Sequence, residues 1–169
     1  MTAYVALLRA VNVGGTGKLA MRDLAAICEA AAFTRVRTYI ASGNVVFRAK
    51  SSEAVIKREL ETALQIHAGK PVGVIVRTAR QIADVLARNP FPETDAKGTV
   101  AIFLDAPPPA DTLASAKGRA GERIALGIRE IYIDYRGSMA RSKLRIPAAA
   151  QGTARNMNTI AKLAVMAAD

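Results

Sequence analysis

A glycine-rich loop that ends in a lysine follows the first apolar segment of the chain. Residues 4–11 are mostly apolar, Arg9 lies among them, and the loop after them carries Asn12, Gly14, Gly15 and Lys18. Glycines let backbone N–H groups come close to a ligand, and a helix after the loop would offer unpaired N–H groups with a partial positive charge. The loop therefore predicts an anion site.

The sequence of this loop can be compared with the patterns of two known nucleotide-binding loops. A Walker A loop needs a glycine five positions before its Gly-Lys pair and a hydroxyl after it, but Asn12 and Leu19 stand there. Residues 15–20 fit a permissive dinucleotide pattern, yet the next β segments read as a short hairpin without the required acidic residue. The pattern favours neither loop. A glycine turn that only links a strand to a helix stays open as the alternative.

The other polar candidate residues are also hydrogen-bond donors, and none of them is acidic. They are Ser42, Asn44, Arg77, Ser142, Lys143, Arg155 and Asn156. Guanidinium groups, amines and amides next to glycine turns are what binding of a phosphate requires. No carboxylate pair and no nucleophile with a neighbouring base is evident, so the sequence identifies no catalytic residue.

The charge balance favours polyanionic partners. The 24 basic residues outnumber the 14 acidic ones, for a net charge of +10, and residues 135–168 hold six basic residues and no acid. Such a surface suits nucleic acid or a phosphate-bearing small molecule.

Single copies of cysteine and histidine restrict the other chemistries. Cys28 alone excludes an internal disulfide and a cysteine-clustered zinc site, and His67 alone excludes paired-histidine catalysis. We therefore expect no metal and no cofactor. The sequence has neither a signal peptide nor an apolar run of the ~20 residues that a membrane helix needs, so we expect no membrane partner and a cytoplasmic location.

The first part of the chain reads as β-α-β-β-α-β. The periodicity predicts a helix over residues 20–32, a hairpin of strands 35–40 and 44–48, and a strand over 72–77. Between them, Ser52 with Glu53 is expected to cap a helix that runs to about His67. Thr78 and Gln81 form a capping box for the next helix. In this split βαβ order the first and third strands are antiparallel neighbours, so the loop after strand one should meet the turn at 42–44.

The second part repeats this order less clearly. We predict a strand over 99–104, a short helix over 111–118, a hairpin of residues 123–128 with 130–135, and a last helix that starts at residues 152–156. The predicted fold class is α+β: two ferredoxin-like halves with antiparallel sheets and a C-terminal helix. The predicted halves are residues 1–78 and 79–169, joined in one compact protein.

Six spaced motifs resemble those of the bacterial domain-of-unknown-function family DUF1697. They cover residues 6–15, 39–47, 76–78, 89–91, 142–144 and 152–159. The resemblance runs from Tyr4 to Leu163 and implies an α+β protein of two ferredoxin-like halves, without an established activity. Two positions depart from the family pattern: Ala10 replaces a usual glycine, which would stiffen the loop, and Met157 replaces a frequent tryptophan, which removes a stacking aromatic.

Three function classes stay open. A nucleic-acid- or nucleotide-binding module fits the charge and the donor-rich motifs, although strand 44–48 lacks the aromatic run of RNA-recognition domains. An enzyme that acts on a phosphate-bearing substrate fits the glycine loop but lacks an evident metal site. A protein-interaction module without a ligand needs none of these donors. The first class is the leading prediction.

Overall fold

The structure is a computed structural model that describes residues 1–13 and 17–169. The candidate residues Gly14 and Gly15 lie outside the described residues. The chain divides into two compact units, one of residues 1–82 with 163–169 and one of residues 83–162. The predicted division between residues 78 and 79 stays a prediction.

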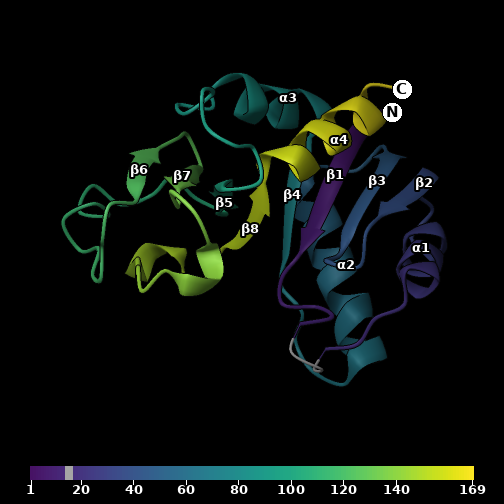
Figure 1. Ribbon diagram of the computed structural model, residues 1–169. Helices are drawn as coiled ribbons and strands as arrows, with labels where there is room; N and C mark the ends of the chain where they lie inside the picture. The colour runs from purple at the N-terminus through teal and green to yellow at the C-terminus, as the bar shows by residue number, and fades with distance from the viewer. Residues whose placement is uncertain (14–16) are drawn as a thin grey trace. The chain divides into compact units, whose positions relative to one another are not determined.

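The first unit has the predicted β-α-β-β-α-β order, and a further helix begins in it (Figure 1). Its elements are β1 (Thr2–Leu8), α1 (Met21–Ala30), β2 (Thr34–Tyr39), β3 (Asn44–Ala49), α2 (Glu53–Ala68), β4 (Val74–Thr78) and α3 (Ala79–Ala87). The strands form one sheet in the order β2-β3-β1-β4, and every neighbouring pair is antiparallel. The predicted hairpin of β2 and β3 and the predicted pairing of the first and third strands are confirmed.

The two helices α1 and α2 cover one face of this sheet. Alternate residues of β1, including Leu8, face Leu24 and Cys28 of α1 and Leu60 of α2 in a common core. Two capping predictions are confirmed at the helix starts: Ser52 Oγ accepts from Val55 N at 3.3 Å, and Thr78 and Gln81 exchange hydrogen bonds of 2.9 and 3.2 Å.

The opposite face of the first sheet is also buried. Its apolar residues Val5, Leu7, Val46 and Ile75 are at most 2% exposed. The C-terminal end of the last helix lies at this face, because Arg37 of β2 binds the Met166 carbonyl and the Asp169 carboxylate, and Arg48 of β3 binds the Asp169 carbonyl. The end of this helix therefore lies on the sheet face that RNA-recognition domains use.

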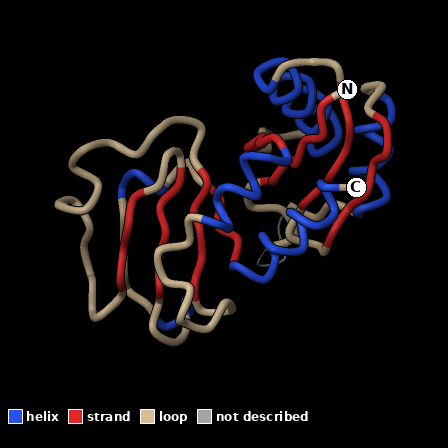
Figure 2. Tube along the Cα trace, turned by 90° about the horizontal axis from the view of Figure 1, so that it is seen from above, coloured by secondary structure: helices blue, strands red, loops and turns tan. Residues whose placement is uncertain are grey.

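The second unit repeats the strand order of the first. It contains β5 (Thr99–Phe103), β6 (Arg123–Leu126), β7 (Glu130–Asp134), two short 3₁₀ helices η1 (Met139–Arg141) and η2 (Pro147–Ala149), β8 (Thr153–Asn156) and the start of α4 (Met157–Ala168). The sheet order is β6-β7-β5-β8, again antiparallel throughout. Figure 2 shows that mostly loops, drawn in tan, connect these strands.

The predicted helix over 111–118 is wrong. The segment forms successive turns at 110–115, and Lys117 then pairs with Arg145 in an isolated β-bridge. Thr112 Oγ1 donates to the Pro109 carbonyl at 2.6 Å, and Leu113 is 45% exposed. A helix this short gains too little from burying one face to offset the cost of its nucleation.

The predicted helix start at residues 152–156 is also wrong, because residues Thr153–Asn156 form strand β8 on the edge of β5. A Cβ on Gly152 would come within 2.7–2.8 Å of Ile102 and Leu104 side-chain atoms, so glycine permits the close approach that pairs the two strands. The helix begins only at Met157, where Asn156 Oδ1 caps it by accepting from Thr159 N at 2.9 Å.

No helix among the described residues is both long enough and apolar enough to span a membrane. The described residues also contain no group of three or more His, Cys, Asp or Glu residues placed to hold a metal ion.

Candidate functional site

A small pocket lies at the edge of the first unit where β1 ends. Its volume is about 170 Å³, and its basic lining residues are Arg9, Lys18, His67 and Lys70. The remaining lining comes from the loop after β1, the end of α2 and the connection to β4. Four side chains that can carry positive charge thus line one cavity large enough for a phosphate group.

Strand topology explains why residues so far apart in sequence meet there. β4 runs antiparallel to β1, with Leu8 opposite Val74, so the chain enters β4 where it leaves β1. The Arg9 amide donates to the Gly73 carbonyl at 2.9 Å and fixes this junction. The helix α2 ends at Gly69 with φ of +73°, which turns the chain toward Lys70 and the pocket.

The Asn12 side chain holds the loop together. Its Nδ2 donates to the carbonyls of Leu19 at 2.9 Å and Ala41 at 2.7 Å, and its Oδ1 accepts from the Leu19 amide at 2.8 Å. The contact with Ala41 joins the loop to the β2–β3 turn, so the two polar turns meet at one edge of the sheet as the topology predicted. For Asn12, the geometry matches the alternative in which the side chain caps the loop.

Asn44 has a similar role in the neighbouring turn. Its side chain is fully buried, and its Nδ2 donates to the Tyr39 carbonyl at 2.8 Å and to Ser42 Oγ at 3.0 Å. Ser42 and Asn44 do not line the pocket, but they fix the turn that Asn12 contacts.

The backbone at this edge is strained. Ala10, Asn12 and Ile40 have φ between +50° and +57°, a conformation that costs an alanine roughly 1–2 kcal/mol. A Cβ at Gly17 would lie 2.8 Å from the Ala10 carbonyl oxygen, so this glycine is required by space as well as by its φ of +63°. Such conformations concentrate at ligand-binding sites.

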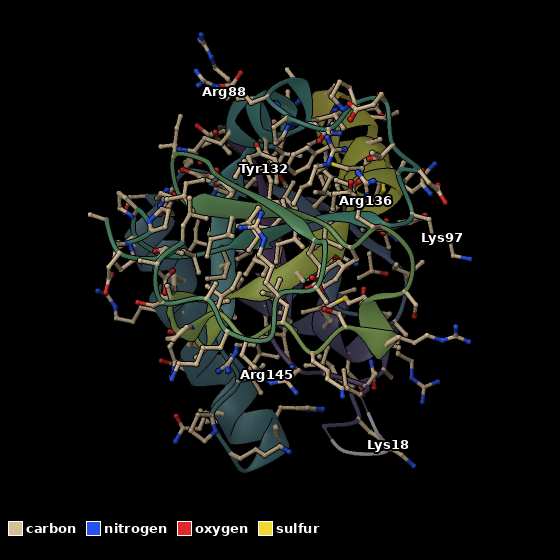
Figure 3. The ribbon with its side chains drawn as sticks, turned by 60° about the vertical axis from the view of Figure 1, so that its left-hand side comes forward. Lys18, Arg88, Lys97, Tyr132, Arg136 and Arg145 are labelled. Carbon is tan, nitrogen blue, oxygen red and sulfur yellow. The ribbon has the colours of Figure 1, made fainter. Side chains whose placement is uncertain are left out.

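The charged side chains among the described lining residues of the pocket are all basic. None of the described residues that line it is an aspartate or glutamate. Asp23 of α1 is not among the lining residues, but its Oδ2 lies 3.9 Å from His67 Nε2, and both side chains are about two-fifths exposed. Lys18 is exposed, and Figure 3 shows its side chain extending away from the ribbon.

Arg77 and Arg155 do not line this pocket, although the sequence grouped them with it. They occupy β4 and β8, the equivalent edge strands of the two sheets, and are 1% and 7% exposed. Arg77 Nη1 donates to the Val76 carbonyl at 3.1 Å, and Arg155 Nη1 donates to Thr153 Oγ1 at 2.7 Å and the Ala154 carbonyl at 2.9 Å. Burial lowers the pKa of Arg155 to about 10. These contacts hold the side chains within the protein.

Ser142 and Lys143 lie in the second unit, along an open hollow that Glu122 also lines. Ser142 Oγ donates to Glu122 Oε2 and also accepts from the Leu144 amide at 3.1 Å. The hydrogen bond from Ser142, followed by that from the Ala120 amide, lowers the pKa of Glu122. The Ser142 hydroxyl thus donates its hydrogen bond to the buried Glu122 carboxylate. Lys143 is exposed.

The sequence analysis did not single out Lys70, and it did not place His67 in the anion site. His67 is exposed and lines the pocket, and Lys70 follows the α2 terminus directly. The missing signal was topological: in a split βαβ unit, the connection into the fourth strand lies beside the end of the first. That rule places residues 69–73 next to Arg9.

One solved structure covers nearly the whole chain. It is described as the structure of the conserved bacterial protein SP0830 from Streptococcus pneumoniae, which is 24% identical, with 98% of each chain covered and a TM-score of 0.81. At that identity the likeness shows the fold alone. No curated protein matches the chain.

The family comparison agrees with the motifs found in the sequence. The profile described as "Protein of unknown function (DUF1697)" matches residues 1–132, well over half of the chain. The chain belongs to the DUF1697 family.

Proposed function

We propose that the protein binds a phosphate-bearing ligand, with a nucleotide as the leading candidate, in the pocket at the end of β1. The observation that supports this is that Arg9, Lys18, Lys70 and His67 line one cavity of about 170 Å³, which no described acid lines. Charge-assisted hydrogen bonds from such groups are about twice as strong as neutral ones.

The size of the pocket favours one phosphate group over a continuous nucleic-acid backbone. Several phosphates would need an extended groove, and the C-terminal end of α4 lies on the sheet face that RNA-recognition domains use. Nucleic acid is the second candidate, because the chain carries a net charge of +10. It would enter the pocket through a terminal phosphate.

Calorimetric titration with inorganic phosphate, pyrophosphate and nucleoside monophosphates at low salt tests this proposal. Lys18→Ala and Lys70→Ala should each weaken binding about tenfold, since each removes one charged donor from the anion. Both lysines are exposed, so folding should be unaffected.

Lys50→Ala is the matched control, because Lys50 is an exposed lysine of the same unit that does not line the pocket. It should bind like the wild type. The proposal is wrong if none of these anions binds, or if the two pocket variants bind as well as Lys50→Ala.

Oligonucleotides with and without a 5′-phosphate separate the two candidates. A strong dependence on the terminal phosphate places the ligand in the pocket. Binding that is independent of it, and that falls steeply with salt, points to contacts along the backbone instead.

A further inference from the structure

Each of the two sheets has two edge strands, and three of these four edges are hindered from pairing with a further chain. The edges are β2 and β4 in the first sheet and β6 and β8 in the second. In β2 the register shifts between Thr34 and Arg37, and Arg35 at this point has a φ of +50°. Irregularities and charged residues of this kind keep a sheet edge from binding another strand.

Side chains bind the outward backbone groups of β4 and β8. In β4 the Val74 amide donates to Glu61 Oε2 at 3.0 Å, and the Val74 carbonyl accepts from Lys57 Nζ. In β8 the Ala154 carbonyl accepts from Arg155 Nη1 at 2.9 Å. A strand that approached either edge would have to break these hydrogen bonds.

The edge of β6 has free backbone groups. The Gly127 amide donates to the Glu130 carbonyl at 2.7 Å, at the turn where the β6–β7 ladder begins. Because hydrogen-bonded and non-bonded pairs alternate along an antiparallel ladder, Leu126 and Ile124 point their amides and carbonyls away from β7. No hydrogen bond from another described residue reaches these outward groups. In Figure 1, β6 lies on the outer side of β7.

An open hollow of about 440 Å³ adjoins this free edge. Its described lining includes Pro90, Ala125, Leu126, Ile128 and Tyr132, and all of these residues belong to the second unit. Leu126 and Ile128 are 38% and 59% exposed, so apolar surface is accessible beside the strand. Tyr132 is labelled in Figure 3.

We infer that β6 binds an extended segment of a partner protein, which adds to the second sheet as a fifth, antiparallel strand. Another extended chain supplies donors and acceptors at the spacing that Ile124 and Leu126 present. The partner residue opposite Ala125 has its side chain on the same face as Ala125. Since Ala125 is small and lines the hollow, an apolar side chain of the partner enters the hollow there.

A second copy of this chain fits the edge less well. Only two residues of β6 point outward, so pairing of two copies through β6 gives a small contact, whereas stable interfaces bury about 1,200–2,000 Å². Each copy also carries a net charge of +10, which disfavours their approach.

Fluorescence anisotropy with three labelled peptides of about nine residues, a typical strand length, tests the inference. The first peptide alternates threonine and valine around a central phenylalanine. The other two have the same side chains but carry two backbone N-methyl groups, either on the residues next to the phenylalanine or on the residues two positions from it.

The position of the methyl groups should decide binding. With the phenylalanine opposite Ala125, the amides next to it face β6, and the amides two positions away face solvent. Methylation of the adjacent amides should weaken binding at least about tenfold, and methylation of the outer amides should change it less than about twofold. The amide chemical shifts of Ile124 and Leu126 should change on binding.

Variants of β6 make the test specific. Leu126→Pro removes an outward amide and leaves the ladder with β7 intact, since proline is tolerated on an edge strand where its nitrogen faces solvent. It should weaken binding of the unmethylated peptide about tenfold, whereas the matched control Leu126→Val keeps the amide and should change binding less than about twofold. Ala125→Phe, which fills the hollow, replaces Leu126→Pro if circular dichroism shows that the latter does not fold.

The inference is overturned if the two methylated peptides bind alike, if no peptide binds at about 1 mM, or if Leu126→Pro binds like Leu126→Val. It is also overturned if the chemical shifts change at β2 and not at Ile124 and Leu126. Self-association in sedimentation that Leu126→Pro abolishes would assign the edge to a second copy instead.

Discussion

At the scale of single residues, Ala10 has a strained backbone conformation. Its φ of +57° lies in the left-handed region, and it borders the pocket. Ala10→Gly should raise the free energy of unfolding by about 0.5–1 kcal/mol, because the relief of steric strain exceeds the extra backbone entropy of glycine in the unfolded chain. Urea denaturation measures the change.

Ala63→Gly, in the middle of α2, is the control for this prediction. A helical alanine has no strain to relieve, so this substitution should lower stability by about 0.5–1 kcal/mol. Equal destabilisation by the two substitutions would show that Ala10 is not strained.

At the scale of elements, the β2–β3 hairpin depends on one buried amide. Asn44→Ala removes the donors to the Tyr39 carbonyl and to Ser42 Oγ in a fully buried position. Leaving that carbonyl without this donor should cost about 1–3 kcal/mol in thermal or urea denaturation. Because Asn12 binds the Ala41 carbonyl of the same turn, the loss should also weaken phosphate binding.

Ser42→Ala is the matched variant for the hairpin. It removes the 3.0 Å contact with Asn44 Nδ2 at a half-buried position and leaves the bond to the Tyr39 carbonyl in place, so it should cost less than about 1 kcal/mol. If Asn44→Ala were as mild as Ser42→Ala, the turn would be held by its backbone alone.

At the scale of the whole molecule, Cys28 reports on the opening of the first unit. Burial, with a smaller effect of the Glu29 charge, raises the pKa of the Cys28 thiol to about 12. A thiol reagent at pH 8 should therefore modify Cys28 only as fast as the first unit unfolds, because the thiolate is the reactive form. Rapid modification of the folded protein would contradict this.

The Cys28 thiol also makes the stability of the protein depend on pH, and the direction of this dependence can be predicted. Below its ordinary pKa of 9.0, folded and unfolded chains both keep the proton, so stability does not depend on the thiol. Between pH 9 and about 12 the unfolded chain releases the proton and the folded one does not, so stability falls as pH rises. Relative to Cys28→Ala, the wild type should lose up to about 1.4 kcal/mol per pH unit in this interval.

Local patterns in the sequence were sufficient to predict most of the first unit. The apolar run of β1, the Ser52 cap and the Thr78–Gln81 capping box each depend on residues within a few positions of one another, and the structure confirms them. The same holds for the antiparallel pairing of β1 with β3, since the split βαβ order requires it.

Tertiary structure decided the features that depend on distant partners. Residues 153–156 are a strand because β5 offers an edge to pair with, and the local pattern around them had predicted a helix. Asn12 binds the Ala41 carbonyl because two turns 29 residues apart meet at one sheet edge. His67 and Lys70 join Arg9 and Lys18 only because β4 starts where β1 ends, a proximity that antiparallel pairing creates and that no spacing along the chain records.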